Sequence, residues 1–181
     1  MRLFEDLDVY AYRKGWPRWA CILVPIFYPS TWPIVAYRFG AWVVRLRSGP
    51  LRHLLYLLYF PLKRITEILT TVEISEHAQI GEGLFVAHIG SIVISHDTKI
   101  GRYASMHQGV TIGVMGRDGS SEKMPEIGDC VYFGAGAKII GPIKIGDNVV
   151  VGANAVVTRD VPDNAIVVGV PASFHPETLT P

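Results

Sequence analysis

Between Ile74 and Val157, aliphatic or aromatic residues recur at every sixth position of the chain. Three runs carry this repeat: Ile74, Ile80, Val86 and Ile92; then Ile94, Ile100, Met106 and Ile112; then Ile127, Phe133, Ile139, Ile145, Val151 and Val157. A period of six fits neither an amphipathic helix nor an alternating strand. It is typical of a β-helix in which each hexad forms one side of a three-sided coil and the leading side chain points inward. The repeat therefore predicts a mainly β, parallel solenoid.

The repeat is interrupted twice, and both interruptions predict loops. Between Val86 and Ile94 the spacing is six plus two, and between Ile112 and Ile127 it is six plus nine. The wall of a β-helix cannot absorb extra residues, so they must bulge outward near Gly90 and within 113–126. Loops on a rigid solenoid commonly carry its chemistry.

The first 71 residues differ in composition from the rest. Residues 1–70 hold ten of the 17 basic residues, four of the 16 acidic ones, all four tryptophans and six of the eight tyrosines. We expect a small, apolar and basic helical region, with a short segment near 10–27, a helix over about 34–47 and another over about 51–69. Prolines break every long apolar run, so a spanning helix is disfavoured.

This composition leaves more than one role open for residues 1–71. Tryptophan, tyrosine and arginine beside apolar faces favour contact with an anionic membrane surface. Packing between subunits, including on the β-helix of a partner, is the alternative, and a spanning hairpin is a weaker one. We expect a cytoplasmic protein that is peripheral on the inner face of the membrane, whose solenoid works without residues 1–70. The basic residues alternate with apolar helices rather than lining a polar face, so no nucleic-acid partner is expected.

Several segments together resemble the serine acetyltransferase branch of the hexapeptide acyltransferases. They are Glu73–Gly83, Ala87–Ile94, Gln108–Gly113, Gly134–Ile139 and Gly169–Ala172, within about 72–173. The resemblance implies a left-handed β-helix at 72–173 with an external loop at 113–126, followed by a tail at 174–181. It also implies a homotrimer that uses acetyl-CoA as co-substrate and needs no metal.

The resemblance assigns catalysis to a histidine in the first inserted turn, which here is His88. The carboxylate that orients it lies fifteen residues earlier, at Glu73, where the branch normally has aspartate. The chemistry suits these residue types, because an alcohol becomes a good nucleophile only when a nearby base takes its proton. Imidazole has a pKa near neutrality, and a carboxylate on its second nitrogen would hold the required tautomer.

The resemblance also places the cofactor and the acceptor. The pantetheine arm would lie against Gly113, Ala135 and Ala153, and the nucleotide end near Thr158 and Arg159. The acceptor side would include Ala87, His107, Lys123 and Met124. Serine acetyltransferases have Asp-His and Arg-His-Pro where this chain has Ala87-His88 and Lys123-Met124-Pro125, so charges that would match an amino acid are missing.

These differences predict an O-acetyltransferase that acts on the hydroxyl of a sugar or a lipid-linked glycan precursor, similar to the exopolysaccharide and colanic-acid type. Two alternatives stay open. One is a serine O-acetyltransferase with a divergent acceptor site. The other is a hexapeptide scaffold without catalytic activity.

Overall fold

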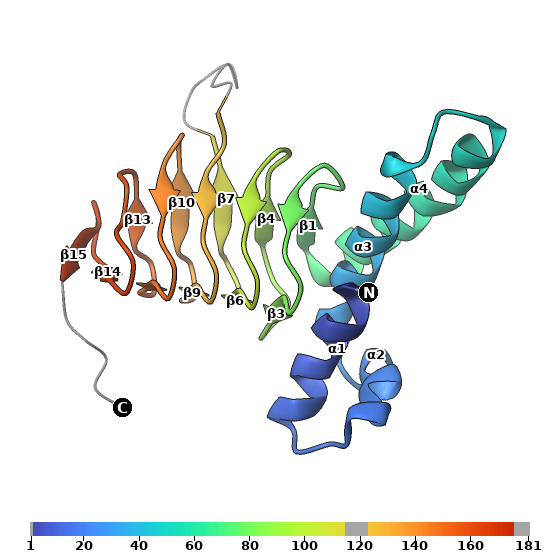
Figure 1. Cartoon of the computed structure of the whole chain (residues 1–181), viewed down its shortest axis with the longest axis horizontal. Helices are drawn as coiled ribbons and strands as arrows, with labels where there is room; N and C mark the ends of the chain where they lie inside the picture. The colour runs from blue at the N-terminus through green and yellow to red at the C-terminus, as the bar shows by residue number, and fades with distance from the viewer. Residues whose placement is uncertain (1, 115–122, 176–181) are drawn as a thin grey trace.

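The computed structural model describes residues 2–114 and 123–175. From Val72 onward, short parallel strands wind into a β-helix (Figure 1). Part of the predicted loop 113–126 and most of the predicted tail 174–181 lie outside the described residues. The strands are β1 (Val72–Ile74), β2 (Gln79–Ile80), β3 (Phe85–Val86), β4 (Ile92–Ile94), β5 (Lys99–Ile100), β6 (Ser105–Met106), β7 (Thr111–Gly113), β8 (Glu126–Ile127), β9 (Tyr132–Phe133), β10 (Lys138–Ile140), β11 (Lys144–Ile145), β12 (Val150–Val151), β13 (Val156–Val157), β14 (Ile166–Val168) and β15 (Ser173–His175).

Among the described residues these strands form three sheets, one for each side of the coil. The orders are β1-β4-β7-β10-β13, β11-β8-β5-β2 and β15-β14-β12-β9-β6-β3, which we name sheets A, B and C. All neighbours are parallel except β15, which returns antiparallel to β14. Sheet C thus extends into the start of the predicted tail.

The six-residue repeat is confirmed as the core of this coil. Its leading residues are all buried, with Ile80, Ile94 and Ile112 at 1% exposure or less. Leading residues stack between coils in register, as in the pairs Ile74 with Ile94 and Ile94 with Ile112. Both predicted insertions fall between strands, so the ladder continues past them.

The glycines after the leading residues serve close packing rather than unusual backbone angles. A Cβ on Gly81 would lie 2.6 Å from the carbonyl carbon of Gly101 in the next coil. The left-handed conformation occurs two residues further on, at Gly83 with φ of +79° and at the equivalent Tyr103 with φ of 57°. The corner therefore needs a small residue at one position and a tolerant backbone at another.

The N-terminal region is helical, with more helix than predicted. Its elements are α1 (Arg2–Arg13), η1 (Arg18–Leu23), α2 (Val24–Phe27), η2 (Pro29–Thr31), α3 (Trp32–Arg45) and α4 (Pro50–Thr70). Helices α3 and α4 match the two predicted helices, and each begins with a proline in its first turn, where the missing N–H costs nothing. Helix α1 was missed, although its buried Asp6, Leu7, Tyr10 and Ala11 recur at helical spacing.

These helices cover the open end of the chain's own β-helix. The Tyr10 hydroxyl donates to the Val86 carbonyl at 2.8 Å and accepts from the Val86 N–H at 2.9 Å. The Tyr37 hydroxyl bonds the Ala78 carbonyl and the Ile80 N–H in the same way. Side chains thus complete hydrogen bonds at β2 and β3 that a further coil would otherwise make.

A buried ion pair joins the helices to the first coil. Asp6 is fully buried, and its carboxylate accepts from Arg38 Nε at 2.7 Å and from the Leu84 N–H at 2.8 Å. Arg38 also donates to the Ile80 carbonyl at 2.8 Å. One apolar core runs through both regions, so residues 1–71 pack on the β-helix of their own chain. None of the three roles predicted for them from the sequence included this packing.

No single helix in the described part of the chain has the length and hydropathy of a membrane span. In the same described part, one bent pair of helical segments, Arg18–Phe27 and Pro29–Arg45, reaches such a length and composition when taken together, and the two meet at an angle of 99°.

Candidate active site

His88 lies on the bulged turn between β3 and β4, at the edge where sheet C passes into sheet A. Its side chain is exposed. Hydrogen bonds to neighbouring segments hold the turn. The Gly109 N–H donates to the Gly90 carbonyl at 2.8 Å, and the Ser91 N–H donates to the Thr71 hydroxyl at 3.0 Å. Gly90 has φ of +129°, a conformation that favours glycine. The two additional residues therefore present His88 to solvent on a defined backbone.

His88 belongs to a cluster of rings on consecutive coils. The His88 and His107 ring centroids are 5.8 Å apart, and those of His107 and Tyr132 are 5.3 Å apart. His107 Nε2 lies 3.0 Å from the Tyr132 hydroxyl, within hydrogen-bond distance. Burial, and then the nearby charges of His88 and Arg13, lower the pKa of His107. The lowered pKa favours the neutral form of the His107 ring beside His88.

Arg13 reaches the edge of this cluster from helix α1. Its Nη2 donates to the Ser105 hydroxyl at 2.9 Å, and its guanidinium lies 3.9 Å from the Phe85 ring centroid. Ser105 is paired in register with Tyr132, so Arg13 brings a positive charge beside the ring cluster. The stacked position of Tyr132 could have been read from the repeat, because it immediately precedes Phe133. Nothing in the sequence links Arg13 to residues more than 90 positions away.

Glu73 lies on β1 with its side chain exposed, paired in register with Val93. Within residues 2–114 and 123–175, Glu73 and His88 share no hydrogen bond or ion pair. The predicted orienting role of Glu73 stays a prediction.

Ala135 and Ala153 lie on the same edge of the coil as His88. The backbone forms a continuous column there: the Gly109 N–H bonds the Gly90 carbonyl, the Gly136 N–H bonds the Gln108 carbonyl, and the Asn154 N–H bonds the Ala135 carbonyl, each at 2.8 Å. Small side chains leave this column open to an extended ligand. Two of the predicted cofactor positions are thus in line with the predicted base.

The other predicted positions lie on the edge between sheets A and B. Gly113 ends β7, and Thr158 and Arg159 follow β13 there. Lys123 and Met124 line a recess of about 580 Å³ together with Lys99 and Lys144. Met124 is only 9% exposed, so little of its side chain is available to an acceptor. One chain therefore divides the predicted residues between two edges, with Ala87, His88 and His107 on one and Lys123 and Met124 on the other.

Comparison with known proteins connects this geometry to a family. Residues 124–159 match the model described as bacterial transferase hexapeptide (six repeats). Over 165 residues the chain is 38% identical to serine acetyltransferase of Mycobacterium tuberculosis, an alignment that covers 91% of this chain and 69% of the relative. The chain belongs to the serine acetyltransferase family. Its solenoid is the left-handed parallel β-helix of the hexapeptide-repeat transferases.

Solved structures of serine acetyltransferases share the fold of this family member almost throughout. Soybean serine acetyltransferase complexed with serine gives a TM-score of 0.79 at 31% identity, covering 96% of this chain and 68% of that one. A serine acetyltransferase in complex with CoA gives 0.75 at 28% identity, covering 95% and 68%. The chain spans between 53% and 69% of the length of the first curated relatives that it matches.

Metal ligation finds no support among the residues that the structure describes. No group of three or more histidine, cysteine, aspartate or glutamate side chains there could hold an ion. Cys21 is buried in the helical region, and Cys130 is exposed on a turn of the coil.

Proposed function

We propose that this protein is an acetyl-CoA-dependent O-acetyltransferase in which His88 is the general base. The proposal rests on the exposed His88, whose turn is held by hydrogen bonds and lies at one end of the column of hydrogen-bonded backbone that includes Ala135. The chain also belongs to the serine acetyltransferase family. The acceptor hydroxyl would give its proton to His88 while its oxygen attacks the thioester carbonyl. Collapse of the tetrahedral intermediate would release the CoA thiolate, which takes the proton back from His88.

Acetyl-CoA would lie along the column of Ala135 and Ala153. The complex of a family relative with CoA supports this co-substrate. Thr158 and Arg159 stand on another edge, so a single chain would not enclose the whole molecule. A homotrimer would bring the edge between sheets A and B of one subunit against the edge between sheets C and A of its neighbour, and would unite the two sets of residues.

L-Serine is the acceptor that the relatives favour, ahead of the sugar hydroxyl that we placed first on sequence grounds. The matched curated relatives are named serine acetyltransferases, and the soybean enzyme has been solved with serine. Arg13, which lies beside the ring cluster in this chain, is a cation that could meet a carboxylate.

A sugar hydroxyl remains the second candidate because of particular residues. Ala87 provides no negative charge for an ammonium group beside His88, and Met124 is nearly buried where a second histidine would be expected. A neutral polyol has no ammonium or carboxylate group, so it would need neither an acidic residue at position 87 nor a histidine at position 124. Polysaccharide precursors are the acceptor class that fits this absence.

A thiol-release assay with acetyl-CoA tests the proposal and separates the two acceptors. The purified chain would be supplied with L-serine, nucleotide sugars or a lipid-linked glycan at equal concentrations, with His88→Ala as the control. Release of CoA that depends on serine and on His88 supports the first candidate, and release that depends on a glycan supports the second. Failure to bind acetyl-CoA and to release thiol with every acceptor would overturn the proposal in favour of a scaffold.

A further inference from the structure

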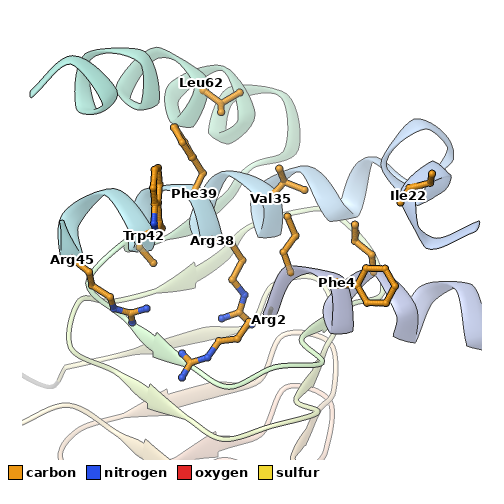
Figure 2. Close-up of a pocket in the computed structure, with 12 residues that line it drawn as sticks. Arg2, Phe4, Ile22, Val35, Arg38, Phe39, Trp42, Arg45 and Leu62 are labelled. Carbon is orange, nitrogen blue, oxygen red and sulfur yellow. The ribbon is translucent and has the colours of Figure 1, made fainter. Parts of the chain in front are cut away.

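An apolar groove of about 850 Å³ lies between helices α1, α3 and α4, away from the candidate active site (Figure 2). This volume is within the range of roughly 300–1,000 Å³ that is usual for small-molecule sites. Its walls are almost entirely hydrocarbon and aromatic, and they are formed by Leu3, Phe4, Leu7, Ile22, Val35, Phe39, Ala41, Trp42 and Leu62. Several of these side chains are open to solvent, with Ile22 at 67% and Trp42 at 51% exposure. Apolar surface of this extent commonly marks a binding site.

One end of the groove is cationic, as Figure 2 shows for Arg2, Arg38 and Arg45. The charge of Arg38 is matched by the buried Asp6. Arg2 donates to the Ile80 carbonyl at 3.3 Å, and Arg45 makes no ion pair or side-chain hydrogen bond with any residue that the structure describes. Among the residues that the structure describes, no acidic side chain lines the groove. Two positive charges are thus left for a ligand to neutralise.

Arg2 and Arg45 also line a second, more polar recess of about 380 Å³ on the first coils of the β-helix. This recess adds Gln79, Lys99 and the backbone around Gly81 and Gly101. It shares Gln79 and Lys99 with the recess of Lys123 and Met124, so a headgroup larger than a phosphate has room to extend along the solenoid.

We propose that this groove binds an anionic amphiphile, with one hydrocarbon chain between α1, α3 and α4 and a phosphate group between Arg2 and Arg45. Burial of the hydrocarbon chain would provide most of the affinity, because each methylene removed from water adds to it. Guanidinium groups donate paired hydrogen bonds to phosphate oxygens, which selects an anionic head over a neutral one.

The asymmetry of the groove favours such a ligand over a protein partner. A partner helix would present polar groups along its length, whereas this groove is apolar on all sides and charged at one end only. Ile26 and Phe27 are exposed on α2, which directly follows the η1 segment that holds Ile22. They would add apolar side chains where the protein meets a membrane that supplies the lipid. The inference does not depend on which acceptor the enzyme uses.

Calorimetric titration of the full-length protein with monomeric dodecyl phosphate tests the proposal. We expect saturation at one molecule per chain. Dodecyl maltoside, which has the same tail and no charge, should bind at least fivefold more weakly, and inorganic phosphate should show no saturable binding. These arms separate a lipid headgroup from a free phosphate.

Two matched pairs of variants locate the site. Leu62→Glu places an acid in the groove and should abolish binding, whereas Leu57→Glu, on the same helix and 70% exposed, lies outside the groove and should bind as the wild type does. Arg45→Gln should weaken dodecyl phosphate binding about fivefold, the effect of one arginine beside an anionic lipid, with no loss for Arg47→Gln.

Three results would overturn the proposal. They are the absence of saturable binding, equal affinity for both detergents, and equal effects of Leu62→Glu and Leu57→Glu. Concentration-dependent self-association that is lost in Leu62→Glu, without amphiphile binding, would assign the groove to a second copy of the chain instead.

Discussion

At the scale of single residues, His88 and Glu76 lie on the same coil in opposite environments, one exposed and one buried. His88 is exposed on a bulge, where a base can meet a substrate. Glu76 is buried near the helices, where its carboxylate accepts from Lys63, from Tyr59 at 3.3 Å and from Tyr56 at 3.4 Å. Substitution of His88 therefore tests the proposed catalysis, and substitution of Glu76 tests a contribution to stability.

Replacing His88 with alanine should lower the rate of acetyl transfer by about 10²–10⁴, because a base acts on the transition state. The affinity for acetyl-CoA should be unchanged, as measured by equilibrium binding. His96→Ala is the matched control, since His96 is an exposed histidine on another turn. Glu73→Gln should cost less than His88→Ala, because orientation is lost while the base remains. A His88→Ala variant with wild-type turnover would remove this histidine from the mechanism.

Glu76 predicts a pH-dependent contribution to stability. Burial acts to raise the pKa of its carboxyl. The hydrogen bond and charge of Lys63, a backbone hydrogen bond and the charge of His77 together outweigh burial and hold that pKa below the usual range. A lowered pKa stabilises the fold above the ordinary carboxyl pKa, and this stability is lost as the pH falls through the folded value.

We therefore expect Glu76→Gln to reduce the free energy of unfolding by about 2 kcal/mol at pH 7, with a smaller difference from wild type below about pH 4. Urea denaturation at the two pH values measures this. Glu126→Gln breaks the pair with Lys99, which is exposed and screened by solvent, and should leave stability nearly unchanged. An equal loss at both pH values for Glu76→Gln would contradict the assigned role of Lys63.

At the scale of elements, the distance between coils depends on glycine. Successive coils approach so closely at the corner that the space above Gly81 is filled by the backbone of Gly101 and Arg102, at 2.6–2.7 Å from the position that a Cβ would take. Backbone cannot rotate away as a side chain can, so the strain would spread to β2 and β5.

Gly81→Ala should consequently destabilise the protein by about 1–3 kcal/mol, the usual cost of overpacking. Gly49→Ala is the matched control, because no atom lies within 4 Å of its added Cβ and its backbone is extended at φ of 170°. Thermal unfolding of both variants measures the difference. Equal melting temperatures would mean that the coils adjust more easily than their packing indicates.

At the scale of the whole molecule, the helical region functions as the cap of the solenoid. Tyr10, Tyr37, Arg38 and Asp6 satisfy backbone groups of the first coil, and helices α3 and α4 pack against β1 (Figure 1). An uncovered coil would present unpaired N–H and C=O groups and an apolar core, which promote aggregation.

Removing residues 1–70 should therefore produce a chain that aggregates, in contrast to the sequence-based expectation that the solenoid works alone. Size-exclusion chromatography of the shortened protein beside the full chain measures this. Tyr37→Phe in the full chain, which leaves the Ala78 carbonyl and the Ile80 N–H without that hydroxyl, should reduce stability by about 1–3 kcal/mol without aggregation. A shortened chain that stays soluble and active would show that the cap is dispensable.

The sequence by itself determined the solenoid, because a coil repeats one local rule. Each leading residue occupies the same inward place, so Ile74, Ile94 and Ile112 could be placed in one stack from their spacing alone. The insertions follow from the same rule, since extra residues must leave the wall, and the first of them marks the turn of His88. The resemblance then supplied roles for residues that periodicity treats as equal.

Tertiary structure alone decided what is not periodic. Helix α1 reaches its partners across more than 70 residues, as Tyr10 does at Val86 and Arg13 at Ser105, and no spacing encodes such contacts. The tertiary structure also divides the predicted site between two edges of the coil. Residues that follow strands of sheet C lie at one corner, and residues that follow strands of sheet A lie at another. A short repeat specifies whether a side chain points into the coil or out of it. Contacts between the two regions depend instead on how the helices of residues 1–71, which have no repeat, pack over the first coil.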